Sequence, residues 1–339
     1  MRLFALAALA LFATAAAPPP PAAPAYHLIR RYVLGGDGGW DYLTFDPQRK
    51  RVFISRSTRV MVVDASNGEL AGTIANTPGV HGIALAPDLG KGFTSNGRDG
   101  TVTVFDLNTL QKLATIQTGA KNPDCIVYDP ATKRVFTFNG GSDDATAIDA
   151  ATNAVIATIP LGGRPEFAVA DGKGRIYDNL EDKSAMAVID AQKAAVVTTW
   201  PMDPCRSPSG LSMDRQNRVL FAACDGQMAM IDADGGKTIA TVPTGKGTDA
   251  TAFYPGENLA FAPNGRDATL TVVASSALKR FSVLENVKTE LGARTMALDP
   301  SNGEVYLVTA QLQVNPNATS YRERYHAVPG TFALLVLAP

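Results

Sequence analysis

Five aspartates recur along this chain at nearly constant intervals. They are separated by 42, 43, 41 and 42 residues and are Asp64, Asp106, Asp149, Asp190 and Asp232. Each ends a short apolar or β-branched run, such as Met-Val-Val-Asp at residues 61–64. One further step reaches Ala274, where the run persists although the aspartate is lost. A fixed period of about 42 residues indicates a repeat fold, in which each repeat is one supersecondary unit stacked on its neighbours.

A second landmark runs in phase with the aspartates and marks a turn in every repeat. It begins at Asp46, Ala86, Asp129, Asp171, Asp214, Tyr254 and Asp299. Seven landmarks predict seven units, each able to form a sheet of four short strands. The sequence therefore predicts an all-β fold, a seven-bladed β-propeller of four-stranded blades.

The third repeat shows the four strands most clearly. They are expected at residues 124–128, 134–138, 145–148 and 154–159. Runs rich in Val, Ile, Thr and Phe alternate with turns rich in Asp, Asn, Pro and Gly, as hairpins require. Asp149 begins the turn after the third strand, where its carboxylate can accept hydrogen bonds from backbone N–H groups. The periodic aspartates are therefore expected to be structural.

The last repeat lacks a fourth strand. Three strands are expected before the chain ends at Pro339, and residues 27–33 form a spare strand near the other end. Pairing that spare strand into the last blade would close the ring and cover an open sheet edge. An insertion at residues 310–330 separates the second and third strands of this blade and includes Tyr321, Arg322, Arg324, Tyr325 and His326. Such a long loop is a possible place for function.

The repeat resembles the YVTN-type propeller repeat of about 40 residues. The similarity is carried by residues 134–139 (Arg-Val-Phe-Thr-Phe-Asn), 147–149 (Ala-Ile-Asp) and 157–165, which end in Gly-Gly-Arg-Pro. The resemblance spans about residues 27–337. Departures are Cys224 in place of the asparagine in the fifth repeat and Ala274 in place of the aspartate in the sixth. The family is mostly exported and bacterial. Related seven-bladed folds include lactone hydrolases and cofactor-dependent dehydrogenase subunits, so the resemblance implies a fold rather than an activity.

Residues 1–25 have the pattern of a signal peptide followed by a Pro/Ala-rich segment. Arg2 supplies a positive charge, residues 3–17 are apolar, and residues 23–25 (Ala-Pro-Ala) offer a cleavage site. Residues 26–339 are expected to be one propeller domain without a transmembrane segment. The predicted location is periplasmic or secreted, and a monomer is expected. A net charge of −1 gives no basic surface for nucleic acid.

Three cysteines are present, at positions 125, 205 and 224. Cys205 precedes the first strand of the fifth repeat and Cys224 follows its second strand, so both fall at one end of a blade. An exported protein can form disulfides, which makes a Cys205–Cys224 bridge plausible; the alternative is two buried thiols. Cys125 is expected to be a small core residue.

The strongest functional signal is a ring of polar residues five positions before each turn landmark. Its members are Asp41, His81, Asp124, Glu166, Ser209, Asp249 and Arg294. They begin the strands that line the central channel, so they should meet at one channel mouth. The loops between second and third strands should open on the same face and add Arg56, Asn96, Arg98, Asn139, Asn264 and Arg266.

The ring has three interpretations. Polar residues are tolerated at any solvated channel mouth, so it could have no function. It could instead bind a small polar or cationic ligand, or a protein partner, because converging groups in a concave site are typical of ligand binding. In the third interpretation, His81, Asp124 and Glu166 hold a divalent cation, Ca²⁺ or another, in a metal-dependent hydrolase of the lactonase kind. The sequence predicts no other cofactor and does not decide whether the protein is an enzyme.

Overall fold

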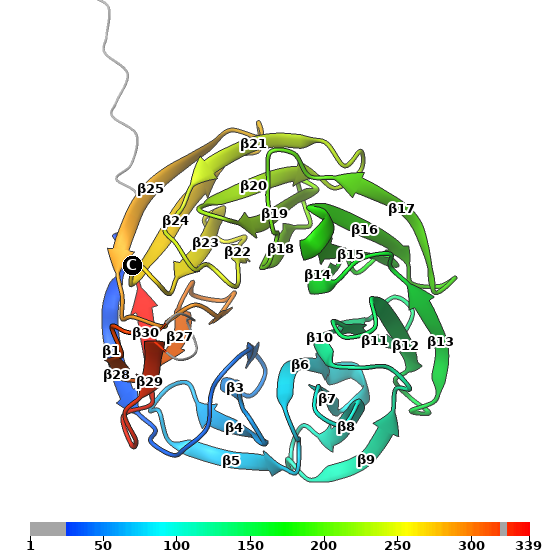
Figure 1. The fold of residues 1–339 in the computed structure, drawn as a ribbon, viewed down its shortest axis with the longest axis horizontal. Helices are drawn as coiled ribbons and strands as arrows, with labels where there is room; N and C mark the ends of the chain where they lie inside the picture. Colours follow the sequence, from blue (N-terminus) through cyan, green and yellow to red (C-terminus); the bar gives the residue numbers. More distant parts are fainter. Residues whose placement is uncertain (1–24, 319–323) are drawn as a thin grey trace, which may run out of the picture.

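The computed structural model describes residues 25–318 and 324–339. Seven antiparallel sheets of four strands surround a central axis, one sheet for each predicted repeat (Figure 1). The innermost strands are β2 (Leu43–Asp46), β6 (Val80–Ala86), β10 (Pro123–Asp129), β14 (Pro165–Ala170), β18 (Leu211–Asp214), β22 (Ala252–Tyr254) and β26 (Met296–Leu298). The prediction of an all-β, seven-bladed propeller is confirmed.

The second and third strands of each blade follow outward from the axis. The second strands are β3 (Arg51–Arg56), β7 (Lys91–Asn96), β11 (Arg134–Asn139), β15 (Arg175–Leu180), β19 (Val219–Cys224), β23 (Leu259–Asn264) and β27 (Val305–Thr309). The third strands are β4 (Arg59–Asp64), β8 (Thr101–Asp106), β12 (Asp144–Asp149), β16 (Ala185–Asp190), β20 (Gln227–Asp232), β24 (Thr269–Ser275) and β30 (Ala333–Ala338). These strands are buried on both faces because a neighbouring blade covers each side.

The outermost strands are half exposed. They are β5 (Leu70–Ala75), β9 (Lys112–Gln117), β13 (Val155–Pro160), β17 (Ala195–Pro201), β21 (Thr238–Pro243), β25 (Phe281–Lys288) and β1 (His27–Val33). Short 3₁₀ turns, η1 (Pro87–Leu89) and η2 (Glu181–Lys183), lie in the second and fourth blades.

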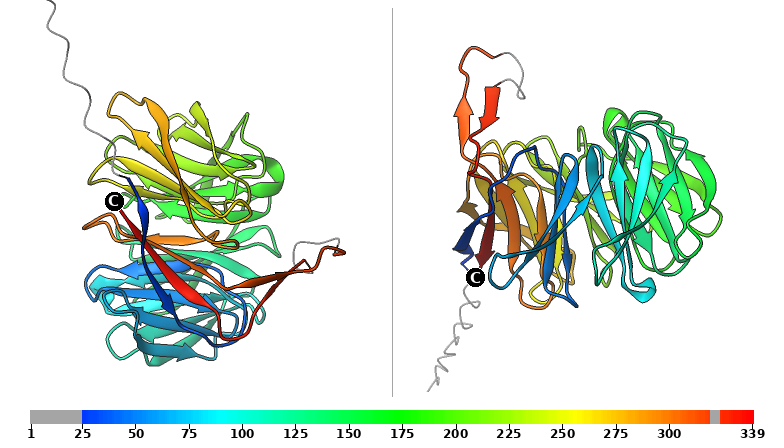
Figure 2. Two further views of the ribbon diagram at one scale, coloured as in Figure 1. Left: turned by 90° about the vertical axis from the view of Figure 1, so that its left-hand side faces the viewer. Right: turned by 90° about the horizontal axis from the view of Figure 1, so that it is seen from below.

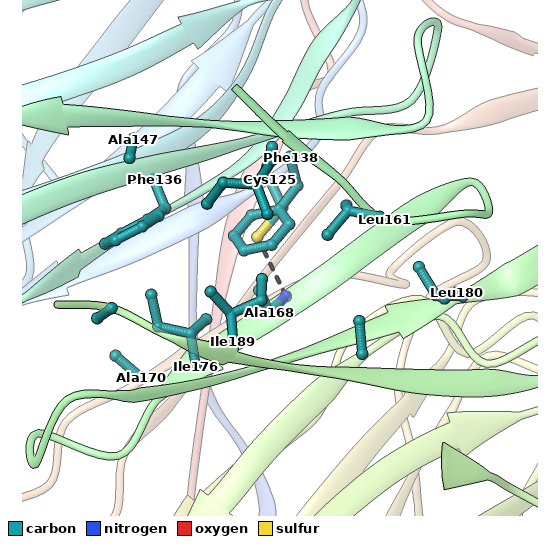
Figure 3. Close-up of a cluster of buried hydrophobic side chains, with 14 of the residues drawn as sticks. Cys125, Phe136, Phe138, Ala147, Leu161, Ala168, Ala170, Ile176, Leu180 and Ile189 are labelled. Atoms are coloured by element: carbon teal, nitrogen blue, oxygen red, sulfur yellow. Dashed lines mark hydrogen bonds between the residues drawn. The ribbon is translucent and has the colours of Figure 1, made fainter. Parts of the chain in front are cut away.

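The core lies between blades. Figure 3 shows the cluster between the third and fourth blades, where Phe136 and Phe138 of one sheet pack with Ile176 and Ile189 of the next. Cys125 belongs to this cluster as a buried free thiol, as expected, and its Sγ accepts a hydrogen bond from the Ala168 N–H at 3.3 Å. Burial raises the pKa of this thiol, so it is an inert core group.

The periodic aspartates serve the turns, as predicted. In the third blade, the Asp149 carboxylate accepts hydrogen bonds from the N–H groups of Ala151 (3.0 Å) and Thr152 (2.8 Å). The same pattern recurs at Asp106 and Asp190. These carboxylates satisfy backbone donors that the turn leaves without strand partners.

The ring is closed by pairing β1 antiparallel with β30, which gives the seventh blade the strand order β1-β30-β27-β26. The predicted closure by the N-terminal strand is therefore confirmed. Arg56 secures the following linker by donating hydrogen bonds to the carbonyl oxygens of Asp37 (2.6 Å) and Gly38 (3.0 Å). Its guanidinium also stacks over the Phe332 ring at 3.6 Å.

The insertion in the seventh blade forms a hairpin of β28 (Leu312–Val314) and β29 (Tyr325–Ala327). It projects from one face of the ring (Figure 2). Tyr321 and Arg322 lie outside the described residues, as does the predicted signal segment up to residue 24. In the part of the chain that the structure covers, no helix has the length and apolar character needed to cross a membrane.

Cys205 and Cys224, the two cysteines expected to pair, are joined by a disulfide. They are separated by 19 positions and tie the segment before β18 to the end of β19. Closing a loop of this length typically stabilises a fold by about 2–4 kcal/mol.

Candidate functional site

The ring of polar residues lies at one end of the innermost strands, as the spacing predicted. In the second, third and fourth blades these residues are the second residues of β6, β10 and β14, and in the other blades they stand just before the strand. His81, Asp124 and Glu166 each fall within a shift of strand register, which is an irregularity of the β-bulge type. Bulges redirect a side chain and are common beside functional sites.

A pair of stacked aromatic rings lies next to this mouth, one position along the chain from two of the ring residues. Tyr42 of the first blade and Phe167 of the fourth blade lie with ring centroids 4.3 Å apart and planes 19° from parallel. Glycines at the corresponding positions of two other blades let neighbouring inner strands approach closely: a Cβ on Gly210 would lie 2.5 Å from Ala250 Cα, and one on Gly82 only 2.8 Å from Ile126 Cγ2. We call the ring of polar side chains at this mouth the bowl, and Tyr42 and Phe167 its aromatic floor.

His81 joins two carboxylates on one side of the bowl. Its Nδ1 lies 2.7 Å from Asp41 Oδ2 and 3.8 Å from Asp124 Oδ1. The Asn122 side chain forms a further hydrogen bond with the imidazole. Gly97 leaves space for this arrangement, since a Cβ there would lie 2.7 Å from His81 Nε2. The imidazole is thus held by the Asp41 and Asn122 side chains.

The contacts between His81 and the two carboxylates shift the pKa values of His81 and Asp124. Burial would lower the pKa of His81, but the hydrogen bond that its ring donates to Asp41 and the charge of Asp124 outweigh this effect and raise that pKa to about 9. Burial raises the pKa of Asp124 to about 6, although the nearby charge of His81 acts to lower it. His81 is therefore a cation at neutral pH.

Arg294 and Asp249 form the opposite side of the bowl. Arg294 Nε lies 2.9 Å from Asp249 Oδ2, and its Nη2 lies 3.9 Å from Asp41 Oδ1. Ser209 donates a hydrogen bond from Oγ to Asp249 Oδ1 at 2.8 Å. These contacts link the fifth, sixth, seventh and first blades around the mouth.

Glu166 has no close cation at hydrogen-bond distance. Its Oε1 lies 3.7 Å from Arg164 Nη1, while Arg164 is engaged more closely by Glu181. Burial, the charge of Asp124 and a hydrogen bond with Glu181 raise the pKa of Glu166 to about 9. This carboxyl therefore retains a proton at neutral pH.

One group of side chains has the spacing needed for a metal ion. Within the described residues it consists of Asp41, His81 and Asp124, whose ligand atoms all lie within 4.8 Å of one another. The structure thus brings together two of the three expected ligands, and Glu166 stands apart beside Glu181. Sequence spacing assigned each residue to a blade but did not show which side chains of neighbouring blades approach one another.

The expectation that the second-to-third-strand loops supply the mouth is wrong for four residues. Asn96, Asn139 and Asn264 are fully buried within their blades, and each donates hydrogen bonds to threonines of the third strand. Arg56 is buried against Phe332. Arg98 and Arg266 are exposed in these loops.

Sequence reasoning missed Tyr42, Phe167, Asn122 and Glu181. The two aromatic residues had a detectable signal, because they stand one position after the ring residues where other repeats carry Gly82, Gly210 or Ala250. Asn122 and Glu181 had none, since each reaches the bowl from a loop or turn outside the repeating positions.

No protein-family model and no curated protein matches this sequence. Among solved structures, the chain is similar to a hydrazine synthase of Kuenenia stuttgartiensis, at 17% identity over 81% of this chain and 94% of that chain, with a TM-score of 0.71. It is also similar to a chain of the mitotic checkpoint complex (15% identity, 99% of both chains, TM-score 0.75). A third similarity is to the WD40 repeats of RRP9 (10% identity, 92% and 97% covered, TM-score 0.76). At these identities the likeness establishes the WD40-like propeller fold.

Glu166→Gln tests the electrostatic crowding of the bowl. A carboxyl with its pKa raised from 4.5 to about 9 binds a proton in the folded state that the unfolded state releases. Its contribution to stability is complete below the unfolded pKa and is lost as the pH rises from about 4.5 to about 9. Urea denaturation at pH 8 should show the variant about 1–3 kcal/mol more stable than the wild type, with little difference at pH 4.5.

The control for this measurement is Glu257→Gln, which alters an exposed glutamate on a turn. It should leave the pH dependence of stability unchanged. If the stability of Glu166→Gln also varied with pH in parallel with that of the wild type, Glu166 would be an ordinary solvated carboxylate.

Proposed function

We propose that this protein is an exported binding scaffold that holds a small polar or cationic ligand, or a cationic group of a protein partner, in the acidic bowl. The observation that supports this most directly is the charge balance of the mouth. Asp41, Asp124, Glu166 and Asp249 face three cations, His81, Arg294 and Arg164, and Arg164 is engaged more closely by a fifth carboxylate, Glu181. The excess of carboxyl groups is concentrated over the aromatic floor, where a positive ligand would relieve their mutual repulsion.

Proton balance supports a cation in particular. Glu166 holds a proton at neutral pH because neighbouring carboxylates and burial disfavour its ionised form. A cation placed beside it would reverse that preference, so binding would release a proton. Affinity is then expected to rise with pH as Asp124 and Glu166 ionise.

Three features support export. Residues 1–25 have the composition of a signal peptide, the repeat resembles the exported YVTN-type family, and a disulfide joins Cys205 to Cys224. Structural disulfides persist in oxidising compartments, and a periplasmic or secreted location supplies one. We propose that the mature protein is a monomer, because each blade already has neighbours on both sides within its own ring.

The binding proposal is tested by calorimetric titration with choline, putrescine and arginine amide, and with acetate and succinate for comparison. At least one cation should bind with a stoichiometry of one, and neither anion should. Asp249→Ala and Glu166→Ala should each weaken cation binding at least tenfold, about 1.4 kcal/mol. Asp225→Ala, an exposed carboxylate in a second-to-third-strand loop, is the matched control. Unchanged affinity in both bowl variants would place the site elsewhere, with the hairpin at residues 310–330 next to be tested.

A second candidate is a metal-dependent hydrolase of the lactonase kind. It is favoured by the grouping of Asp41, His81 and Asp124 within 4.8 Å. Two carboxylates and an imidazole provide oxygen and nitrogen ligands suited to a divalent cation. If the His81 Nε2–H donates to Asn122, Nδ1 becomes the ligand atom once its proton is displaced, and Asn122 fixes the ring as an outer-shell partner. A bound ion would lower the pKa of a coordinated water and so supply a nucleophile for ester or lactone hydrolysis.

Elemental analysis of natively purified protein separates the two candidates. The hydrolase predicts about one divalent ion per chain, lost in His81→Ala and Asp124→Ala, with metal affinity that rises as the pH increases towards the His81 pKa of about 9 and levels off above it. His326→Ala in the hairpin is the matched control, because it removes a histidine outside the bowl. Metal-free protein from a metal-replete preparation would exclude the hydrolase and leave the binding scaffold.

A further inference from the structure

The opposite end of the channel contains a second pocket, separate from the acidic bowl. Its volume is about 380 Å³, and it is lined by the far halves of β2, β6, β10 and β14 together with Arg215. Each of these strands runs from the bowl to the turn on the other face. Tyr42 and Phe167 precede the lining residues of their strands, so the stacked rings divide the two sites.

The pocket wall is mainly apolar. Ile83, Leu85, Ile126, Val127 and Val169 contribute aliphatic side chains from three neighbouring blades. The volume falls within the range of about 300–1,000 Å³ that is typical of small-molecule sites. An apolar chain or ring could therefore be enclosed here with few polar groups to desolvate.

Two charged residues line this pocket, and only the acidic one already has a charged partner. Asp46 is already satisfied, since it accepts hydrogen bonds from the Gln48 N–H (3.0 Å) and from Arg49 Nη1 (3.0 Å). Arg215 donates through Nη2 to the Ala170 carbonyl oxygen at 2.7 Å. Among the described residues, no carboxylate forms an ion pair with Arg215. The pocket thus has one guanidinium with donors to spare and no acid committed to it.

The surroundings of Arg215 favour an anionic ligand. Neighbouring protein lowers the pKa of its guanidinium by desolvation, an effect opposed in part by Asp171. Asp171 itself is engaged by Arg218 at 2.9 Å, so it is not the direct partner of Arg215. The side chain remains exposed to solvent on one side, which leaves it accessible. A planar carboxylate matches the fork geometry of an arginine and would restore the lost solvation.

We propose that this pocket binds a small amphipathic monocarboxylate, with its apolar body between the inner strands and its carboxylate on Arg215. The two mouths of the channel then differ in chemistry. The bowl attracts cations, and the far pocket takes an anion that carries an apolar tail. Because the aromatic floor lies between them, the proposal for the far pocket can be tested independently of the function proposed for the bowl.

The test is calorimetric titration of the full-length mature protein with octanoate, octylammonium and succinate. Octanoate has both the apolar chain and the single carboxylate, octylammonium reverses the charge, and succinate lacks the apolar body. Octanoate should bind with a stoichiometry of one and at least tenfold more tightly than either comparison compound. Equal binding of octylammonium, or no binding of octanoate, would overturn the proposal.

Two variants locate the site. Arg215→Gln should weaken octanoate binding at least tenfold, whereas Arg134→Gln should not, although Arg134 also donates to backbone carbonyls of a neighbouring blade. Val127→Glu places a negative charge in the apolar wall and should also abolish octanoate binding. Thermal unfolding and circular dichroism establish that each variant is folded. Full octanoate affinity in folded Arg215→Gln, or its loss in Glu166→Gln of the bowl, would contradict the assignment.

Discussion

The pairing of β1 with β30 is the interaction on which the rest of the structure depends. It joins the first and last strands of the described chain in one sheet and covers the edge of β30 that would otherwise be open. Arg56 then holds the linker that leads from this closure into the first blade. A closed ring fixes the distance across the channel, and that distance allows Tyr42 of the first blade to stack on Phe167 of the fourth.

The aromatic stack lies between the two proposed sites, which differ in chemistry. Above it, seven blades each contribute one polar side chain to a bowl in which carboxyl groups outnumber cations. Below it, aliphatic side chains surround a pocket that includes Arg215, whose guanidinium forms no ion pair with any carboxylate of the described residues. Rigid strands position both sets of groups, so little conformational entropy has to be lost when a ligand binds. This rigidity is what the two proposed binding sites require.

Most of the fold could be predicted from the sequence because the signal repeats. The Asp149-type turns and the missing last strand specified the blades and their closure, and the position before each turn identified the mouth residues. The floor could not be predicted, since Tyr42 and Phe167 meet across the ring from strands 125 positions apart. The sequence placed the asparagines that end the second strands in exposed loops. Asn139 is instead buried, and its side chain donates hydrogen bonds to Thr146 and Asp144. Periodicity places a residue along a strand but does not show how far its side chain reaches.

The central claim is that the bowl is an electrostatically crowded site that is relieved by a positive ligand. The most direct measurement is the pKa of Glu166, obtained from the ¹³C chemical shift of its carboxyl carbon in a pH titration. The account predicts a value of about 9 in the free protein and a lower value when a cation is bound. A pKa near the ordinary 4.5 in the free protein would contradict it.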